Sequence, residues 1–137
     1  MAKYYGSILD FTKQRNTDLL NNLRRVLHSM KYISMPEAFR LVADSPAQRF
    51  YVSEERATIV ISSLISGRNI PKMRKNRHEM FHEILRRYII LRLKFPHKSM
   101  LELISEIVNQ PAPKFYLTPR TVGEFIYRIK KKKNVKQ

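Results

Sequence analysis

Apolar residues recur at spacings of three and four along much of the chain, the period of an amphipathic helix. Two longer stripes consist of Leu19, Leu20, Leu23, Val26, Leu27 and Met30, and of Phe81, Ile84, Leu85, Tyr88 and Ile89. Two further stripes consist of Ala57, Val60, Ile61 and Leu64, and of Val122, Phe125, Ile126 and Ile129. No segment gives a convincing sheet, so the pattern predicts an all-α fold.

Capping signals place the starts of two short helices between these stripes. Ser34 is followed by Glu37, and Ser99 is followed by Glu102. This spacing is that of a capping box, in which the hydroxyl and the carboxylate satisfy free backbone N–H groups at the start of a helix. We therefore predict a helix after Ser34 and an equivalent helix after Ser99.

The last helix of each half has its own start signal. Ser53 and Thr118 are favourable N-cap residues, and Pro119 suits the first helical position. Gly67 stands where a left-handed residue would end the earlier of the two helices. Each half of the chain thus reads as a longer helix, a turn, a short helix, an extended connection and a third helix.

The two halves of the chain are similar in sequence. Residues 34–66 align with residues 99–131 without a gap at an offset of 65, and the helices upstream align at an offset of 62. The agreement is highest between residues 46–53 and 111–118, where every difference but one is conservative. An internal repeat of this length indicates a duplicated supersecondary unit.

We predict two tandem tri-helical, helix-turn-helix-like repeats packed in one compact unit. Residues 1–68 form the first repeat with an N-terminal arm, and residues 69–137 form the second with a basic linker and a basic tail. A standard helix-turn-helix joins its last two helices by three or four residues. Here the connection from Asp44 to Val52 is longer and contains an extended piece, so a variant geometry is expected.

Composition adds a strong positive charge to this picture. The 137 residues include 27 Lys and Arg against 11 Asp and Glu, a net charge of +16. Residues 1–68 have a net charge of +4 and residues 69–137 a net charge of +12. Cysteine is absent, which excludes disulfides and thiolate metal sites. With no signal peptide and no membrane span, we expect a cytoplasmic protein, or a virion component if a phage encodes it.

A positive field of this size attracts polyanions, so we predict nucleic-acid binding, with duplex DNA as the first interpretation. The protein would act as a regulator or accessory factor of a phage or mobile element. The alternative is a structural or adaptor protein, such as a virion or packaging component. Homo-oligomers and protein partners remain open, and no cofactor is expected. Candidate nucleic-acid-binding residues are Arg56, Arg74, Lys75, Arg86, Arg87, Lys114, Arg120, Thr121, Arg128, Lys130, Lys131 and Lys132.

In each repeat a Phe-Tyr pair follows a cation, Arg49 in the first and Lys114 in the second. One interpretation is that the rings stack on unpaired bases beside a phosphate contact. The interpretation we prefer is that the rings fill and cover the core, because aromatic residues dominate the burial of small units.

His78, Glu79 and His82 form a literal H-E-x-x-H pattern. On a helix the two imidazoles share one face and could bind zinc, with the glutamate as general base. Glu102 or Glu106 could add a third ligand, which makes a zinc-dependent hydrolase the second alternative. We prefer a surface histidine pair, because the first repeat lacks the pattern and the surrounding stretch is basic.

A final indication comes from a resemblance. Short uncharacterised helical proteins of Bacteroidetes genomes, phages and mobile elements contain a segment that is similar to Pro111-Ala112-Pro113-Lys114-Phe115-Tyr116-Leu117-Thr118-Pro119. The resemblance covers roughly residues 76–131. It implies a mobile-element or phage setting, and it supplies no functional residues.

Overall fold

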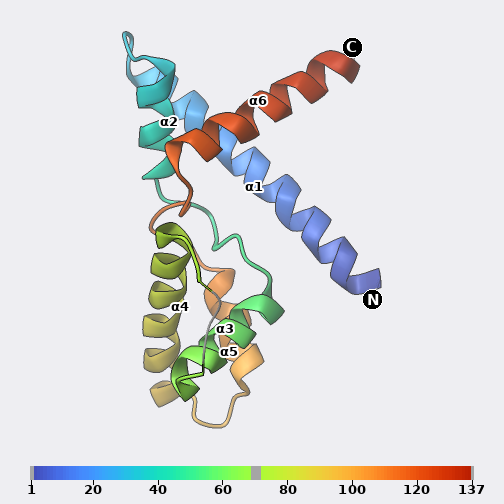
Figure 1. The fold of residues 1–137 in the computed structure, drawn as a ribbon, viewed down its shortest axis with the longest axis vertical. Coiled ribbons are helices and arrows are strands. Elements are labelled where there is room, and N and C mark those ends of the chain that lie inside the picture. Colours follow the sequence, from blue (N-terminus) through green and yellow to red (C-terminus); the bar gives the residue numbers. More distant parts are fainter. Residues whose placement is uncertain (1, 69–71, 137) are drawn as a thin grey trace. The chain divides into compact units, whose positions relative to one another are not determined.

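The computed structural model describes the backbone of residues 2–68 and 72–136 and the side chains of residues 11–68 and 72–132. Every regular element in these ranges is an α-helix, which confirms the all-α prediction (Figure 1). None of these helices is long and apolar enough to cross a bilayer. The elements are α1 (Ala2–Ser29), α2 (Met35–Ala43), α3 (Glu54–Ser66), α4 (Lys75–Lys94), α5 (Met100–Val108) and α6 (Pro119–Lys136).

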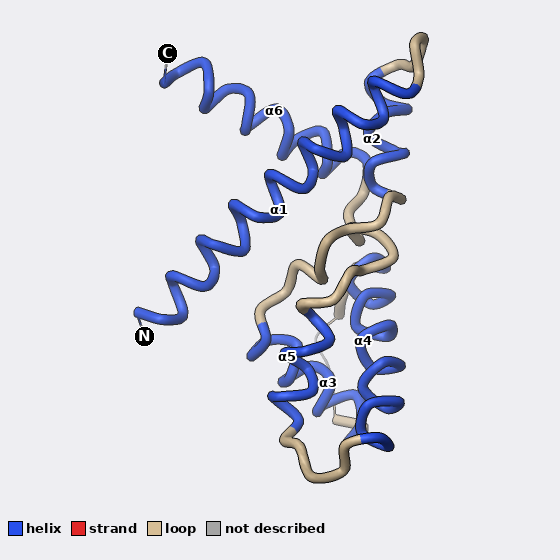
Figure 2. Tube along the Cα trace, turned by 180° about the vertical axis from the view of Figure 1, so that it is seen from behind, coloured by secondary structure: helices blue, strands red, loops and turns tan. Residues whose placement is uncertain are grey.

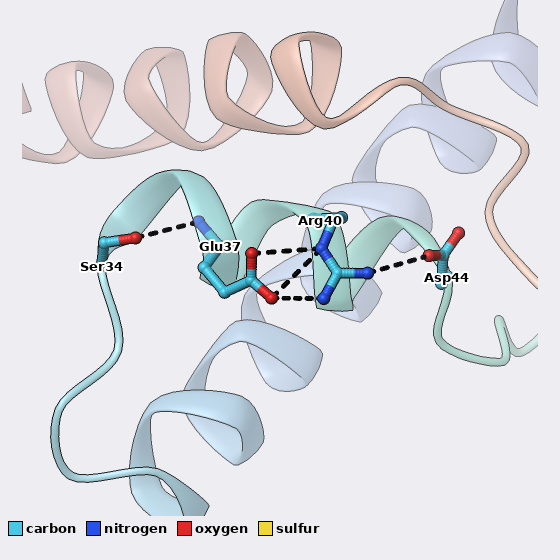
Figure 3. Close-up of polar contacts among 4 residues, drawn as sticks. All are labelled: Ser34, Glu37, Arg40 and Asp44. Atoms are coloured by element: carbon cyan, nitrogen blue, oxygen red, sulfur yellow. Dashed lines mark hydrogen bonds and ion pairs between the residues drawn. The ribbon is translucent and has the colours of Figure 1, made fainter.

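The short helices α2 and α5 begin at the predicted caps. The backbone N–H of Glu37 donates to the hydroxyl of Ser34 at 3.3 Å, and that of Glu102 donates to the hydroxyl of Ser99 at 3.1 Å. The Glu37 carboxylate accepts from the guanidinium of Arg40, which also lies 4.0 Å from Asp44 (Figure 3). This guanidinium lowers the pKa of Glu37. The predicted hydrogen bond to the serine hydroxyl is therefore confirmed at both caps. The Glu37 carboxylate instead pairs with Arg40, one turn further along α2.

The third helices α3 and α6 also begin as predicted. The hydroxyl of Ser53 accepts from the backbone N–H of Arg56 at 3.1 Å, and that of Thr118 accepts from Thr121 at 3.1 Å. Gly67 ends α3 in the left-handed conformation, with φ of 71°. Such a φ costs a glycine little and other residues more, so this position explains the residue found there.

The helices group into two compact units whose membership cuts across the sequence repeats. Unit 1 comprises residues 1–47 and 113–137 and contains α1, α2 and α6. Unit 2 comprises residues 48–112 and contains α3, α4 and α5. Within each unit all three helices pack on one another. The third helix that follows α2 in the sequence thus packs with α4 and α5, and the third helix that follows α5 packs with α1 and α2.

We call this pairing, in which each third helix packs with the helices of the other half of the sequence, the exchange of third helices. One backbone hydrogen bond in each unit holds it. In unit 2 the N–H of Phe50 donates to the carbonyl of Val108 at 3.0 Å. In unit 1 the N–H of Phe115 donates to the carbonyl of Ala43 at 3.3 Å. Phe50 and Phe115 are matched by the repeat offset, and so are Ala43 and Val108. Each connection before a third helix is therefore held at the end of the short helix from the other half of the sequence.

A close helix contact in unit 1 favours α6 over α3 as the partner of α2. A Cβ atom built on Gly123 would lie 2.8 Å from a ring carbon of Phe39. At the matched position α3 carries Thr58. Because real Cβ atoms essentially never approach so closely, α3 could not take this place on α2 without displacing the ring. The Phe39–Gly123 contact thus gives a physical reason for the exchanged pairing.

The apolar stripes predicted from the sequence form the cores of the two units at their centres. The large side chains with an exposed fraction below 2% are Phe50, Phe81, Leu19, Ile61, Ile84, Leu103, Ile104, Ile107, Val42, Val108 and Val122. The stripes were drawn too long at one end. Leu27 and Met30 are exposed near the end of α1, and Ile89 is exposed at the side of α4, next to the buried Tyr88.

Three of the four rings of the aromatic pairs are buried and Tyr51 is half-buried, which agrees with the preferred interpretation that the rings fill and cover the core. Phe50 is 1% exposed, Phe115 is 5% exposed and Tyr116 is 8% exposed. Their rings are therefore closed to a stacking base. Tyr116 also has a positive φ of 57°, an uncommon conformation for a residue with a side chain.

In unit 1 the long helices α1 and α6 cross beside α2, and their outer ends diverge from the crossing (Figures 1 and 2). The backbone of α1 is helical from Ala2, where the sequence had indicated a short arm. The side chains of residues 1–10, which would form the expected arm, lie outside the described part of the chain. The crossing leaves a groove between α1 and α6.

Candidate nucleic-acid interface

The groove between α1 and α6 consists of two adjoining hollows in unit 1. One has a volume of about 580 Å³ and the other a volume of about 510 Å³, and both are lined by Asn16 and Lys132. The first is lined by Thr12, Arg15, Asn16, Phe125, Arg128, Ile129, Lys131 and Lys132. The second is lined by Lys13, Asn16, Thr17, Leu20, Asn21, Arg24, Ile129 and Lys132.

Among the side chains of residues 11–68 and 72–132, those that line the groove are positively charged or uncharged and none is a carboxylate. Three cations come from α6, namely Arg128, Lys131 and Lys132. Three more come from α1, namely Lys13, Arg15 and Arg24. Apolar side chains lie among the cations, so the groove can offer both phosphate contacts and a flat apolar wall.

Arg15 is held in a defined position on the wall of the groove. Its guanidinium carbon lies 4.0 Å from the centre of the Phe125 ring, within the range of a cation–π contact. Its Nη2 donates to the side-chain oxygen of Asn16 at 3.3 Å. The helix α1 supplies Arg15 and Asn16, and α6 supplies Phe125, so this cluster requires the exchanged third helix.

Three predicted residues near the start of α6 are engaged within unit 1. Arg120 lies 3.4 Å from Glu124, although both side chains are largely exposed. The hydroxyl of Thr121 lies 2.9 Å from that of Thr118 and belongs to the helix cap. The ammonium of Lys114 lies 5.5 Å from the centre of the Tyr116 ring. Lys130, one turn beyond the centre of α6, is exposed.

Unit 2 has a second group of cations at the start of α4 and α3. Arg74 is the N-cap residue of α4, and the first turn of this helix contains no acidic residue. The pKa of Arg77 is lowered by burial and by the nearby charge of Arg56. Within the described part of the chain, neither Arg56 nor Arg77 forms an ion pair with an acidic side chain. Lys75 lies 4.0 Å from Glu79. Of the three predicted residues in this group, Arg56, Arg74 and Lys75, it is the one with an ion pair among the described residues.

Arg86 and Arg87 are tied to an acidic side chain of their own helix. Glu83 accepts from Arg86 at 2.7 Å and from Arg87 at 2.8 Å. Hydrogen bonds from Arg86 and Arg87 lower the pKa of this carboxyl, against a smaller opposing effect of burial. Arg87 also donates to the carbonyl of Pro111 at 3.0 Å and lies over the Phe50 ring. Its position thus serves the packing of unit 2.

The histidine pair lies on one exposed face of α4. The Nε2 atoms of His78 and His82 are 3.3 Å apart. Within the described residues no third His, Cys, Asp or Glu joins them, so Glu102 and Glu106 do not complete a metal site. Glu79 lies next to Lys75. This arrangement corresponds to a surface pair of imidazoles.

Four cations of these surfaces were not among the predicted residues. Lys13 and Arg15 were missed because no partner for the first half of α1 can be assigned from the sequence. Arg24 lies beside the apolar stripe of α1, where an arginine can equally cover apolar surface. Lys13 and Arg24 line one hollow and Arg15 lines the other, because residues two apart point to opposite sides of a helix. Only the packing of α6 makes both sides walls of one groove. Arg77 was missed inside the H-E-x-x-H region, although it belongs to the same basic run as Arg74.

Comparison of the chain with protein-family models, with curated proteins and with solved structures gives no match.

Proposed function

We propose that this protein binds nucleic acid, and duplex DNA in particular, as a regulator or accessory factor of a phage or mobile element. The observation that carries the proposal is the groove of unit 1, in which the described side chains include six cations and no carboxylate. Phosphate groups are the natural partners of such a surface, because each contact releases condensed counterions. The genomic setting rests on the resemblance of the segment around Phe115.

The architecture we propose for this function is a duplicated three-helix unit of the helix-turn-helix kind, with exchanged third helices. Two observations support it. The helices α2 and α5 have matching bounds at the repeat offset, and so do the starts of α3 and α6. The hydrogen bonds of Phe50 and Phe115 are matched in the same way. In this arrangement α6 is the third helix that presents the most cations.

The test is DNA binding by a variant that lacks the cations of α6 in the groove. We expect the triple substitution R128A, K131A and K132A to weaken binding to duplex DNA by a similar factor whatever the DNA sequence. The slope of log affinity against log salt should fall by about 3, because each phosphate contact contributes roughly one unit. Fluorescence anisotropy across a salt series measures both quantities.

The matched control removes three cations that already have acidic partners. Arg40, Arg86 and Lys98 pair with Glu37, Glu83 and Glu106. The variant R40A, R86A and K98A has the same net charge as the groove variant, and its salt slope should stay close to that of the wild type. Equal slopes for the two variants would mean that net charge alone drives binding, and the groove would lose its role.

An adaptor or virion role is the second candidate, and exposed apolar side chains favour it. Such side chains gather at the turns that join each long helix to its short helix, and contiguous exposed apolar surface often marks a protein interface. They are Leu27, Met30, Tyr32 and Met35 in unit 1, and Ile89, Ile90, Leu93, Phe95 and Leu101 in unit 2. A partner held there should stay bound at high salt, whereas DNA should be released.

A further inference from the structure

The groove of unit 1 has the size and the mixed lining of a site for a small planar group. The hollow that contains Phe125 has a volume of about 580 Å³, within the range of ligand pockets. Polar atoms for hydrogen bonds are present on Thr12 and Asn16, and Ile129 adds apolar surface. A purely electrostatic contact with a duplex backbone would not need this apolar wall.

The wall carries a stacked pair that a nucleobase can extend. Arg15 lies 4.0 Å over the ring of Phe125, and both residues line the hollow. Unpaired bases are recognised by stacking on aromatic rings and on the planes of arginine guanidinium groups. A base inside a duplex has both faces covered by its neighbours, so only an unpaired base can use such a wall.

Further cations of α6 line the same hollow as this pair. Arg128, Lys131 and Lys132 follow Phe125 at distances of three, six and seven residues along α6, and all line the same hollow. Residues three and seven apart share one face of a helix, so Arg128 and Lys132 lie on the face of Phe125, and Lys131 is one turn along the helix from Arg128. A base seated against Arg15 would therefore have cations beside it for its own phosphate and for the next one.

We propose that the groove between α1 and α6 takes an unpaired nucleotide of DNA, at an end or a gap of the duplex that the protein binds. This inference rests on the proposed function, and it names the feature of DNA that the groove selects. The site depends on the exchange, because Arg15 comes from the first half of the chain and Phe125 from the second.

The test compares two forms of one duplex with the full-length protein. The first form ends in a short overhang of thymidines, and the second in an overhang of abasic nucleotides that keeps the phosphates and lacks the bases. We expect the wild type to bind the thymidine form about tenfold more tightly in fluorescence anisotropy, the effect of stacking one base. Equal affinities would overturn the inference.

Substitutions then ask whether this ratio comes from the stacked pair. R15K keeps the charge and removes the planar guanidinium, so the ratio should fall towards one. F125L should act in the same direction, and R15K decides the question if F125L fails to fold. The matched control is R25K, the same change at an exposed position of α1 outside the groove, for which the ratio should persist. A ratio that survives R15K would overturn the assignment to this groove.

The outcomes separate this inference from the proposed function. Tight, salt-dependent binding of both overhangs with a ratio of one leaves DNA binding in place and removes the unpaired nucleotide. Absence of binding to any form removes both. A ribonucleotide overhang that binds more tightly than the thymidine overhang would overturn the choice of DNA.

Discussion

Unit 1 and unit 2 each contain three helices that pack on one another, but the two units differ in their charge. Unit 1 contains 15 basic and 5 acidic residues, and unit 2 contains 12 basic and 6 acidic residues. In unit 2 the carboxylates of Glu83 and Glu106 bind arginine or lysine side chains. In unit 1 the described side chains that line the groove between α1 and α6 include no carboxylate. The same scaffold thus offers an open cationic surface in one unit and a more neutralised one in the other.

The exchange of third helices is responsible for much of this difference. The basic helix α6 follows α5 in the sequence, yet it packs with α1 and α2. The halves of the sequence have net charges of +4 and +12, whereas unit 1 has +10 and unit 2 has +6. Helix exchange therefore moves positive charge from the second half of the sequence to the unit that is built mainly from the first.

The most severe test of the comparison divides the chain in its middle. We expect the fragments 1–70 and 71–137 to be unfolded alone, since each lacks the third helix of the unit it begins. Mixed together, they should regain helix content and form a one-to-one complex, as measured by circular dichroism and light scattering. If each fragment folded alone as a monomer, the exchanged arrangement would be wrong.

A smaller effect, on the free energy of unfolding, is expected when α6 is given the residue of α3 at the contact between Phe39 and Gly123. The substitution G123T installs in α6 the residue that α3 has at position 58. It should destabilise the protein by about 1–3 kcal/mol in urea unfolding, because the new side chain would overpack against Phe39.

The second change in unit 1 should relieve this strain. F39I installs the residue that α5 has at the matched position 104, and G123T combined with F39I should recover a large part of the lost stability. The reverse change in unit 2, T58G, should cost no more than about 1 kcal/mol, the helix propensity of glycine. If the two changes at 39 and 123 were simply additive, the contact would not be the source of the pairing preference.

The smallest effect concerns the ion pairs of unit 2. E83Q removes the carboxylate that holds Arg86 and Arg87, and we expect a loss of about 1 kcal/mol at neutral pH. The pKa of Glu83 is lower in the folded protein than in the unfolded chain. The contribution of this carboxylate is therefore complete above the ordinary glutamate range and is lost as the pH falls through the lowered pKa.

Unit 1 provides the matched control for this pH dependence. Glu124 pairs with Arg120 at a largely exposed site, so E124Q should change the free energy of unfolding by less than about 0.5 kcal/mol. Urea unfolding of the three proteins between neutral and acidic pH measures the difference. Identical pH profiles for the wild type and E83Q would show that Glu83 does not stabilise unit 2.

Local structure could be predicted from the sequence because its causes are local. The caps at Ser34, Ser53 and Ser99 and the left-handed stop at Gly67 depend on residues within one turn of the helix. The core positions of each helix followed from the period of its apolar residues. The burial of Phe50 and Phe115 followed from the size of their rings relative to a small unit.

The pairing of helices could not be predicted in the same way, because the repeat makes the alternatives nearly equivalent. Both third helices present similar apolar faces, and the choice depends on a particular contact such as that of Phe39 with Gly123. One signal was available. The connection from Asp44 to Val52 is much longer than a helix-turn-helix turn, and a long extended connection is what an exchanged helix requires.

The groove was predicted in part for a related reason. The cations of α6, Arg128, Lys131 and Lys132, could be chosen from the sequence as an exposed basic face. Their partners Lys13 and Arg15 could not, since they become neighbours of α6 only through the exchange. A site that combines two distant segments is visible only when the packing is known.

The exchange also determines how the protein would respond to a mechanical load. Both termini belong to unit 1, while unit 2 is a single continuous segment between residues 48 and 112. A force that pulls the termini apart acts first on the packing of α1 against α6, and unit 2 bears no tension until unit 1 has opened. The protein would therefore extend in two steps, and the first step would dismantle the cationic groove.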